Sequence, residues 1–283
     1  MKIGLLAIFR NESHILKEWL THYVSQGIDV FYLINNASED KFEDILKGFN
    51  VVLRNEPYVG PTDILELGGR QIEAYNEFLP HIDCDWLYVC DLDEFAYGRN
   101  GLTIKTFLEQ YGDKFEQYLI PLKTFNSNDI IKQPSSVVKS FVRRKKEEGY
   151  ALFKPLVKRS NISVIGVNYC TLKAGRTAKG DLSLITEGFI SNERKIDKDT
   201  ELAFRNAIRN GLMENSFLVS NHYSLQSKEW FFNVKATRGT ATWHGGSKMP
   251  AHDWFNYIWN RIEKYDTVID LELSTQKGYN VTQ

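Results

Sequence analysis

The sequence predicts an α/β fold in which a mostly parallel sheet carries helices on both faces. Apolar runs of strand length alternate with stretches of helical period between residues 3 and 90. Polar side chains follow the predicted strands at the point where each strand ends. The strand at residues 86–90 is the most informative, because Asp91, Asp93 and Glu94 come directly after it.

The elements of the N-terminal half follow from local patterns. Strands are predicted at short apolar runs rich in β-formers: residues 2–9, 30–34, 51–53 and 86–90. Helices are predicted where apolar residues recur with helical period: residues 15–24, 39–47 and 70–78. Asn11 or Ser13 is placed to cap the first helix, and Gly27 is placed to end it.

The acids after residue 90 predict a metal and phosphate site. In an extended chain, side chains two residues apart point the same way, so Asp91 and Asp93 project to one side. Two like charges repel each other unless a cation lies between them, and a hard divalent ion prefers oxygen ligands. The alternative is a solvated acidic turn, because a D-x-D sequence often occurs by chance.

A second polar set is predicted to share the same edge of the sheet. Right-handed crossovers bring the carboxyl ends of parallel strands together, which makes a crevice suited to a nucleotide. The residues predicted to line it are Arg10, Glu12, Asn36 and Ser38. For Asn36 and Ser38, plain helix capping is the alternative. The sequence contains no G-x-G-x-x-G after the first strand and no Walker lysine, which disfavours dinucleotide enzymes and P-loop kinases.

Composition limits the class of protein. The chain has 283 residues and a net charge of -1, which does not indicate a dedicated nucleic-acid binder. Three cysteines without metal-binding spacing fit buried thiols in a reducing compartment. The run at residues 2–9 is too short to span a bilayer and lacks a signal-peptide pattern. The chain is therefore expected to be cytoplasmic, with peripheral attachment at the inner face of the membrane as a variant of that expectation.

Two long runs carry a resemblance to a known family. They are FRNESHILKEWLTHYVSQGIDVFYLINNASED at residues 9–40 and RQIEAYNEFLPHIDCDWLYVCDLDEF at residues 70–95. Together they resemble glycosyltransferase family 92 and related bacterial family-2-like enzymes. The resemblance implies a GT-A fold and sugar transfer from a nucleotide-sugar, with a divalent metal held by Asp91 and Asp93. It also implies that Gln71 and Asp91 help to bind the donor.

A third run, SNHYSLQSKEWFFNVKATRGTA at residues 220–241, extends the resemblance. It implies that His222 is the third protein ligand of the metal, and an imidazole suits manganese better than magnesium. The alternative is a histidine that is simply hydrogen-bonded near a helix start. Lys235 and Arg238 are placed to close on the diphosphate, although basic residues also favour helix C-termini in general.

The catalytic base is left open among three carboxylates. A base must take the proton of the acceptor hydroxyl, and the candidates are Asp129, Asp181 and Glu187, with Asp129 preferred. Relatives carry glycines where this chain has Asn126 and Asp129, which is a departure from the family pattern.

The C-terminal half is expected to cover the acceptor side. Strands are predicted at residues 118–122, 151–158 and 162–170, and helices at residues 201–212, 227–234 and 254–265. The last helix is aromatic on several faces and is interpreted as packed core or an oligomer contact. The expected division is a catalytic domain at 1–225, with a nucleotide-binding half at 1–95 and an acceptor half at 96–225. A helical segment at 226–283 is expected to pack on that domain.

The leading hypothesis is a metal-dependent, inverting glycosyltransferase. It would move a hexose from a UDP-linked donor to a saccharide acceptor of a surface polysaccharide or glycan, with Mn²⁺ or Mg²⁺. One alternative is a non-catalytic carbohydrate-binding protein on the same fold. The other is a phosphohydrolase with Asp91 as nucleophile and Asp93 as acid, which Phe95 and the distance of the motif from the chain start disfavour.

Overall fold

The structure, a computed structural model, describes residues 1–56, 69–146, 152–185, 212–238 and 251–276. Its N-terminal elements alternate along the chain: β1 (Ile3–Phe9), α1 (Ser13–Ser25), β2 (Val30–Asn36), α2 (Glu43–Leu46), β3 (Val51–Glu56), α3 (Gly69–Phe78), β4 (Trp86–Val89), β5 (Glu94–Gly98) and α4 (Ile104–Tyr111). The central elements are β6 (Gln117–Thr124), α5 (Val137–Ser140), β7 (Arg143–Lys145), β8 (Phe153–Lys158), β9 (Ile162–Val164), β10 (Thr171–Leu172), β11 (Thr177–Lys179) and β12 (Leu184–Ile185). The C-terminal elements are α7 (Leu212–Asn215), β13 (Leu218–His222), α8 (Lys228–Trp230), the π-helix η4 (Phe231–Lys235), α9 (Ala236–Arg238), α10 (Ala251–Glu263) and β14 (Thr267–Ile269).

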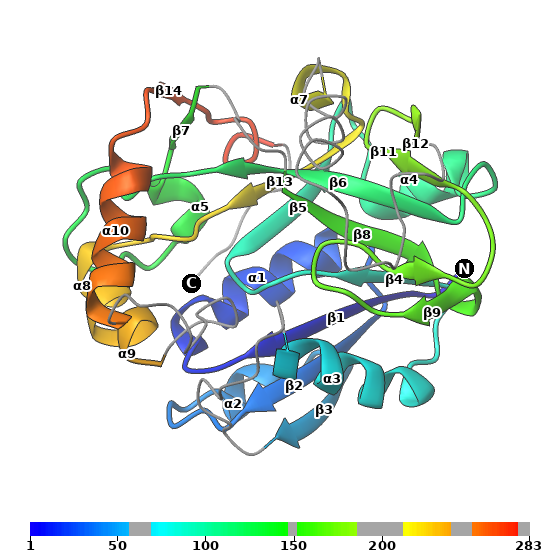
Figure 1. The fold of residues 1–283 in the computed structure, drawn as a ribbon, viewed down its shortest axis with the longest axis horizontal. Coiled ribbons are helices and arrows are strands. Elements are labelled where there is room, and N and C mark those ends of the chain that lie inside the picture. Colours follow the sequence, from blue (N-terminus) through cyan, green and yellow to red (C-terminus); the bar gives the residue numbers. More distant parts are fainter. Residues whose placement is uncertain (57–68, 147–151, 186–211, 239–250, 277–283) are drawn as a thin grey trace.

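A ten-stranded sheet forms the centre of the molecule (Figure 1). Its main path runs β12-β11-β6-β8-β4-β1-β2-β3. β1 is parallel to both β2 and β4, and β2 is parallel to β3. β8 lies between β4 and β6 and is antiparallel to both. The parallel β1–β4 portion puts the carboxyl ends of its strands at one edge, as the sequence predicts.

Helices cover both faces of this sheet because β1 is apolar on both of its sides. Ile3, Leu5 and Ala7 pack in one buried cluster with α1 and α4, whereas Leu6 packs in a second cluster with α3. Successive side chains of a strand point to opposite faces, so a strand buried on both faces needs a continuous apolar run. The predicted α/β class, with helices on both faces of a central sheet, is confirmed.

β13 occupies a position that the sequence analysis did not predict. It pairs antiparallel with β5 and parallel with β6, so a strand late in the chain lies between two earlier ones. Its first four residues are fully buried, and its last residue, His222, is partly exposed. Residues 218–222 therefore form part of the sheet, and His222 ends the strand.

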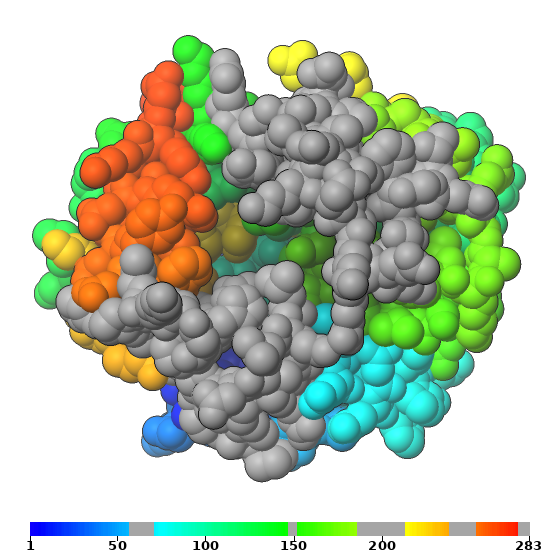
Figure 2. Space-filling view, in the orientation of Figure 1, coloured from blue at the N-terminus to red at the C-terminus, as the bar shows by residue number. Residues whose placement is uncertain are grey.

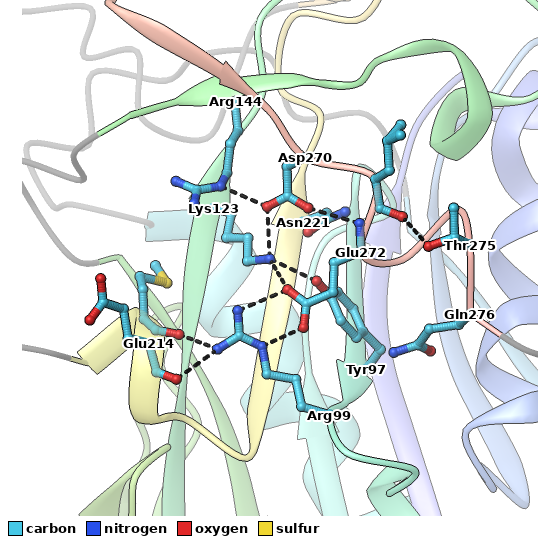
Figure 3. Close-up of polar contacts among 12 residues, drawn as sticks. Tyr97, Arg99, Lys123, Arg144, Glu214, Asn221, Asp270, Glu272, Thr275 and Gln276 are labelled. Atoms are coloured by element: carbon cyan, nitrogen blue, oxygen red, sulfur yellow. Dashed lines mark hydrogen bonds and ion pairs between the residues drawn. The ribbon is translucent and has the colours of Figure 1, made fainter.

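The C-terminal segment is tied to the sheet by buried charges (Figure 3). The Lys123 side chain of β6 is 1% exposed, and its ammonium donates to Asp270 at 2.9 Å and to Glu272 at 2.7 Å. Arg144 donates to the same Asp270 carboxylate at 2.7 Å, and Arg99 reaches Glu272 at 2.6 Å. Because the buried Lys123 and the partly buried Arg99 and Arg144 all have carboxylate partners, the segment after β14 is held against β5 and β6.

Three local differences from the sequence prediction have physical causes. The helix predicted at residues 39–47 begins only at Glu43, because Asp40 instead accepts from the Ser13 amide at the start of α1. Neither Asn11 nor Ser13 caps α1 with its side chain; the N-cap residue is Glu12. The strand predicted at 162–170 stops at Val164, and the Gln117 side chain bonds both the amide and the carbonyl of Cys170.

Other C-terminal predictions have mixed outcomes. The predicted strands at 118–122 and 151–158 correspond to β6 and β8. Ser227 caps α8 by accepting from the Trp230 amide. The aromatic helix, α10, packs through Phe255 and Ile262 against Phe231 of η4. The helix predicted at 201–212 lies almost entirely outside the described residues. Every helix in the described ranges is too short or too polar to cross a bilayer.

Candidate active site

The acidic motif lies in the short connection between β4 and β5. β4 ends at Val89 and β5 begins at Glu94, so Asp91 and Asp93 occupy the turn between two buried strands. β13 approaches this turn directly, because His222 is the cross-strand partner of Glu94 and the Tyr223 amide donates to the Asp93 carbonyl at 2.8 Å. Strand pairing therefore brings His222 to the acids. Figure 2 shows a recess in the molecular surface beside α10 (orange).

Three side chains at this point fit a divalent cation. Asp93, Glu94 and His222 each offer a ligand atom, and these atoms lie within 4.8 Å of one another. The Nε2 of His222 is 3.6 Å from Oδ1 of Asp93. Burial lowers the pKa of His222, although Asp93 acts in the opposite direction. The lowered pKa favours the neutral imidazole, which is the form that binds metals. An imidazole among carboxylate oxygens is tolerated more readily by Mn²⁺ than by Mg²⁺, which prefers oxygen ligands.

Asp91 lies outside this trio among the described side chains. Its Oδ2 accepts from the Lys154 ammonium at 2.8 Å, and its Oδ1 accepts from the Gln71 amide at 3.2 Å. Gln71 also donates to the Tyr75 hydroxyl at 2.8 Å. The structure thus joins two residues predicted to bind the donor, Gln71 and Asp91, while the role of Asp91 as a metal ligand stays a prediction.

Lys154 is a buried cation beneath the acidic turn. It projects from β8, its side chain is 3% exposed, and its ammonium is 2.8 Å from Asp91 and 3.4 Å from Glu94. Burial alone would lower the pKa of Lys154, but Asp91 and Glu94 outweigh it and raise that pKa, so the ammonium is charged. Burial raises the pKa of Glu94 in spite of Lys154. Lys154 therefore supplies positive charge that a metal alone was expected to supply.

Replacing Lys154 by methionine should destabilise the fold strongly. The change would leave the buried Glu94 and the partly buried Asp91 without their cation, and losing one partner of a buried pair costs about 3 to 5 kcal/mol. Urea denaturation monitored by circular dichroism measures this. Lys158→Met on the same strand is the matched control, because that side chain is 27% exposed and should cost less than about 1 kcal/mol. Equal losses for both variants would contradict a special role for Lys154.

Lys235 reaches the acidic turn from the C-terminal segment. Its ammonium donates to Oδ2 of Asp93 at 2.9 Å and to the Ser224 carbonyl at 2.7 Å. Lys235 is the last residue of η4, and α9 ends at Arg238. The side chain of Arg238 lies outside what the structure describes. Of the two basic residues predicted to contact the diphosphate, Lys235 is therefore brought to the acids.

The predicted nucleotide rim lies where β1 and β2 end. The Ser38 hydroxyl accepts from the Asn11 amide at 3.0 Å, which joins the loops after these two strands. Arg10 is within 3.4 Å of the Glu39 carboxylate. Glu12 is buried at the start of α1, and Asn36 is the last residue of β2. The four predicted rim residues thus share one edge of the sheet, and their contact with a nucleotide stays a prediction.

The candidate bases have separate surroundings. Asp129 is 83% exposed and forms an ion pair with Arg143 at 3.0 Å. Its φ of 60° is left-handed, a conformation that aspartate adopts more readily than most residues other than glycine. Asp181 accepts from the Ser183 amide in the turn between β11 and β12. Glu187 lies outside the described residues. Their catalytic roles stay predictions.

Sequence reasoning missed Lys154, although a signal was present. β8 reads Phe-Lys-Pro-Leu-Val-Lys, and a lysine within an apolar strand is rarely buried unless a carboxylate pairs with it. The pattern therefore indicated a buried ion pair. It did not indicate the partner, because Asp91 lies 63 residues earlier in the chain.

Comparison with curated proteins finds two glycosyltransferase family 92 relatives. A protein from Oryza sativa subsp. japonica is 24% identical over 108 residues, which are 38% of this chain and 18% of the relative. A protein from Ricinus communis is 24% identical over 106 residues, which are 36% of this chain and 18% of the relative. The aligned part is thus less than a fifth of either relative. No family model matches the chain. The family resemblance predicted from the motifs is confirmed at this level.

Two solved structures are similar to part of the chain. S. aureus TarS 1–349 in complex with UDP matches with a TM-score of 0.37 and 16% identity, covering 56% of this chain and 47% of that chain. HddC from Yersinia pseudotuberculosis matches with a TM-score of 0.35 and 12% identity, covering 63% of this chain and 89% of that chain. The fold class rests on the strand order and helix placement of the chain itself.

Proposed function

We propose that this chain is a metal-dependent glycosyltransferase that moves a hexose from a nucleoside-diphosphate sugar to a saccharide acceptor. The observation that carries the proposal is the meeting of Asp93 and His222, two residues far apart in sequence, at the carboxyl edge of the sheet. The similarity of part of the chain to family 92 proteins supports it.

The site residues would divide the work as follows. Asp93 and His222 would hold a divalent cation, for which Mn²⁺ suits the mixed oxygen and nitrogen donors. When bound, that cation would neutralise the negative charge of the leaving nucleoside diphosphate. Lys154 and Gln71 fix Asp91 beside it, where its carboxylate can meet the metal or the ribose. Arg10, Glu12, Asn36 and Ser38 would bind the nucleoside at the neighbouring strand ends.

The remaining parts of the proposal concern the reaction and its acceptor. The donor is UDP-linked and the transfer inverts the anomeric centre, so one carboxylate must deprotonate the acceptor hydroxyl. Asp129 is proposed for that step, and its exposed position leaves it able to meet a large saccharide. The acceptor belongs to a surface polysaccharide or glycan.

A panel of nucleotides tests this function by thermal unfolding. UDP, UDP-glucose, UDP-galactose, GDP-mannose and ADP are each added with and without Mn²⁺. A ligand that binds only the folded state increases the free energy of unfolding, by about 2.7 kcal/mol at a ligand concentration one hundred times its Kd. The melting temperature rises as a result. We expect a shift with uridine nucleotides that grows with Mn²⁺. Equal melting temperatures across the panel, together with no hydrolysis or transfer of any UDP-sugar, would refute the proposal.

A further inference from the structure

The carboxylate of Asp93 divides its two oxygens between two different partners. Oδ1 faces the imidazole of His222 at 3.6 Å, and Oδ2 accepts from the ammonium of Lys235 at 2.9 Å. The side chains of Asp93 and Lys235 are 8% and 14% exposed, so little solvent screens the pair. An internal cation thus already lies against one of the oxygens proposed to attract a metal.

Lys235 is held in this position by more than charge. Its ammonium also donates to the Ser224 carbonyl at 2.7 Å and lies 5.6 Å from the centre of the Trp230 ring. It ends η4, a π-helix, and single turns of this kind are frequent at functional sites. The preceding residue, Val234, lines a cavity of about 520 Å³.

The charges around the turn set up a competition. Asp91, Asp93 and Glu94 face Lys154 and Lys235 among the described side chains. A divalent cation on Asp93 would meet the ammonium of Lys235 at close range, and like charges at such a distance repel strongly where water is scarce. A diphosphate beside the cation would offer the ammonium new oxygen partners.

We propose that Lys235 is an internal counter-ion of Asp93 that exchanges places with the divalent cation and transfers to the diphosphate of the nucleotide. The inference rests on the proposed function and deepens it. It makes the binding of cation and nucleotide mutually dependent. The cation displaces Lys235 from Asp93, which frees the ammonium to bind the diphosphate. A bound diphosphate draws Lys235 away from Asp93, which frees the carboxylate to bind the cation. By linkage, the nucleotide must then increase cation affinity by the same factor as the cation increases nucleotide affinity.

Direct binding measurements test the exchange without any turnover. Free Mn²⁺ is followed by electron paramagnetic resonance, and UDP binding is followed by calorimetry with and without Mn²⁺. Without nucleotide, Lys235→Met should bind Mn²⁺ at least about fivefold more tightly than the wild type, the lower end of ordinary coupling. UDP should increase Mn²⁺ affinity in the wild type and much less in the variant, and UDP alone should bind the variant more weakly.

Matched variants separate the exchange from general effects of charge. Lys228→Met removes the same charge from an exposed position on α8 and should leave both affinities unchanged. Lys235→Gln, which can still donate to the Ser224 carbonyl, serves if the methionine variant does not fold. Unchanged or weaker Mn²⁺ binding in the neutral Lys235 variant would overturn the exchange. Mn²⁺ binding by none of the proteins would also overturn it.

The outcomes distinguish this inference from the proposed function. UDP binding to the wild type, with no effect of Lys235 on Mn²⁺, overturns the exchange and leaves the nucleotide-binding proposal standing. Tighter Mn²⁺ binding by the Lys235 variant, with no UDP binding to any of the proteins, supports an internal counter-ion of Asp93 and contradicts the glycosyltransferase proposal.

Discussion

Replacing Asp93 by asparagine should lower the turnover of a UDP-sugar by at least about 100-fold. The change keeps the size of the side chain but removes the charge that faces both His222 and Lys235. Loss of one electrostatic or metal-binding group at the reacting phosphate commonly costs this much in rate. Turnover is measured as release of UDP in the presence of Mn²⁺.

The same variant should unfold at nearly the wild-type temperature without metal. The substitution removes the ion pair between Asp93 and Lys235, but it also relieves the repulsion between Asp93 and the neighbouring carboxylate of Glu94, and these effects oppose each other. Asp83→Asn is the control, because Asp83 is 92% exposed and its partner is Lys2 at the protein surface. Wild-type turnover in the Asp93 variant would refute the metal and phosphate site.

Replacing His222 by alanine should lower Mn²⁺-dependent turnover by about 10- to 100-fold, the usual cost of disturbing a group that holds or orients a metal. His222 supplies the only nitrogen of the described trio, and its position is fixed by the pairing of β13 with β5. The loss should appear as a higher Mn²⁺ requirement as well as a lower rate. His81→Ala, at an exposed position, should change neither.

The pH dependence of the rate should identify His222 separately. Burial lowers the pKa of His222, so the neutral, metal-binding form persists to lower pH than for a free imidazole of pKa about 6.5. The wild-type rate should therefore hold as pH falls to the ordinary imidazole range and decline only below it. The alanine variant should lack this decline, and an identical acid decline in both proteins would assign it to another group.

The N-terminal half could be predicted because its signals are local. The alternation of β1, α1, β2 and β3 follows from short apolar runs, helical stripes and the glycine that ends α1, each visible within a few residues. The acidic turn was visible for the same reason. Its chemistry was harder to predict, because Lys154 and Lys235 bind the acids from positions 63 and 142 residues away.

The placement of β13 could not be predicted from pattern. The apolar residues of a buried strand are visible in the sequence, but the strands that pair with it are not. β13 pairs antiparallel with β5 and parallel with β6. The family resemblance predicted that His222 is a ligand of the metal. The structure explains its approach by a different route, since cross-strand pairing with Glu94 puts the imidazole beside Asp93.

The late position of β13 has a consequence for biosynthesis. Asp93 leaves the ribosome 129 residues before His222 (222 − 93), and β5 and β6 lack the strand between them until then. At about 5 to 20 residues per second, that interval is roughly 6 to 26 s. During this interval β5 and β6 lack the strand that pairs with both of them, and unpaired strand edges of this kind favour association with other chains.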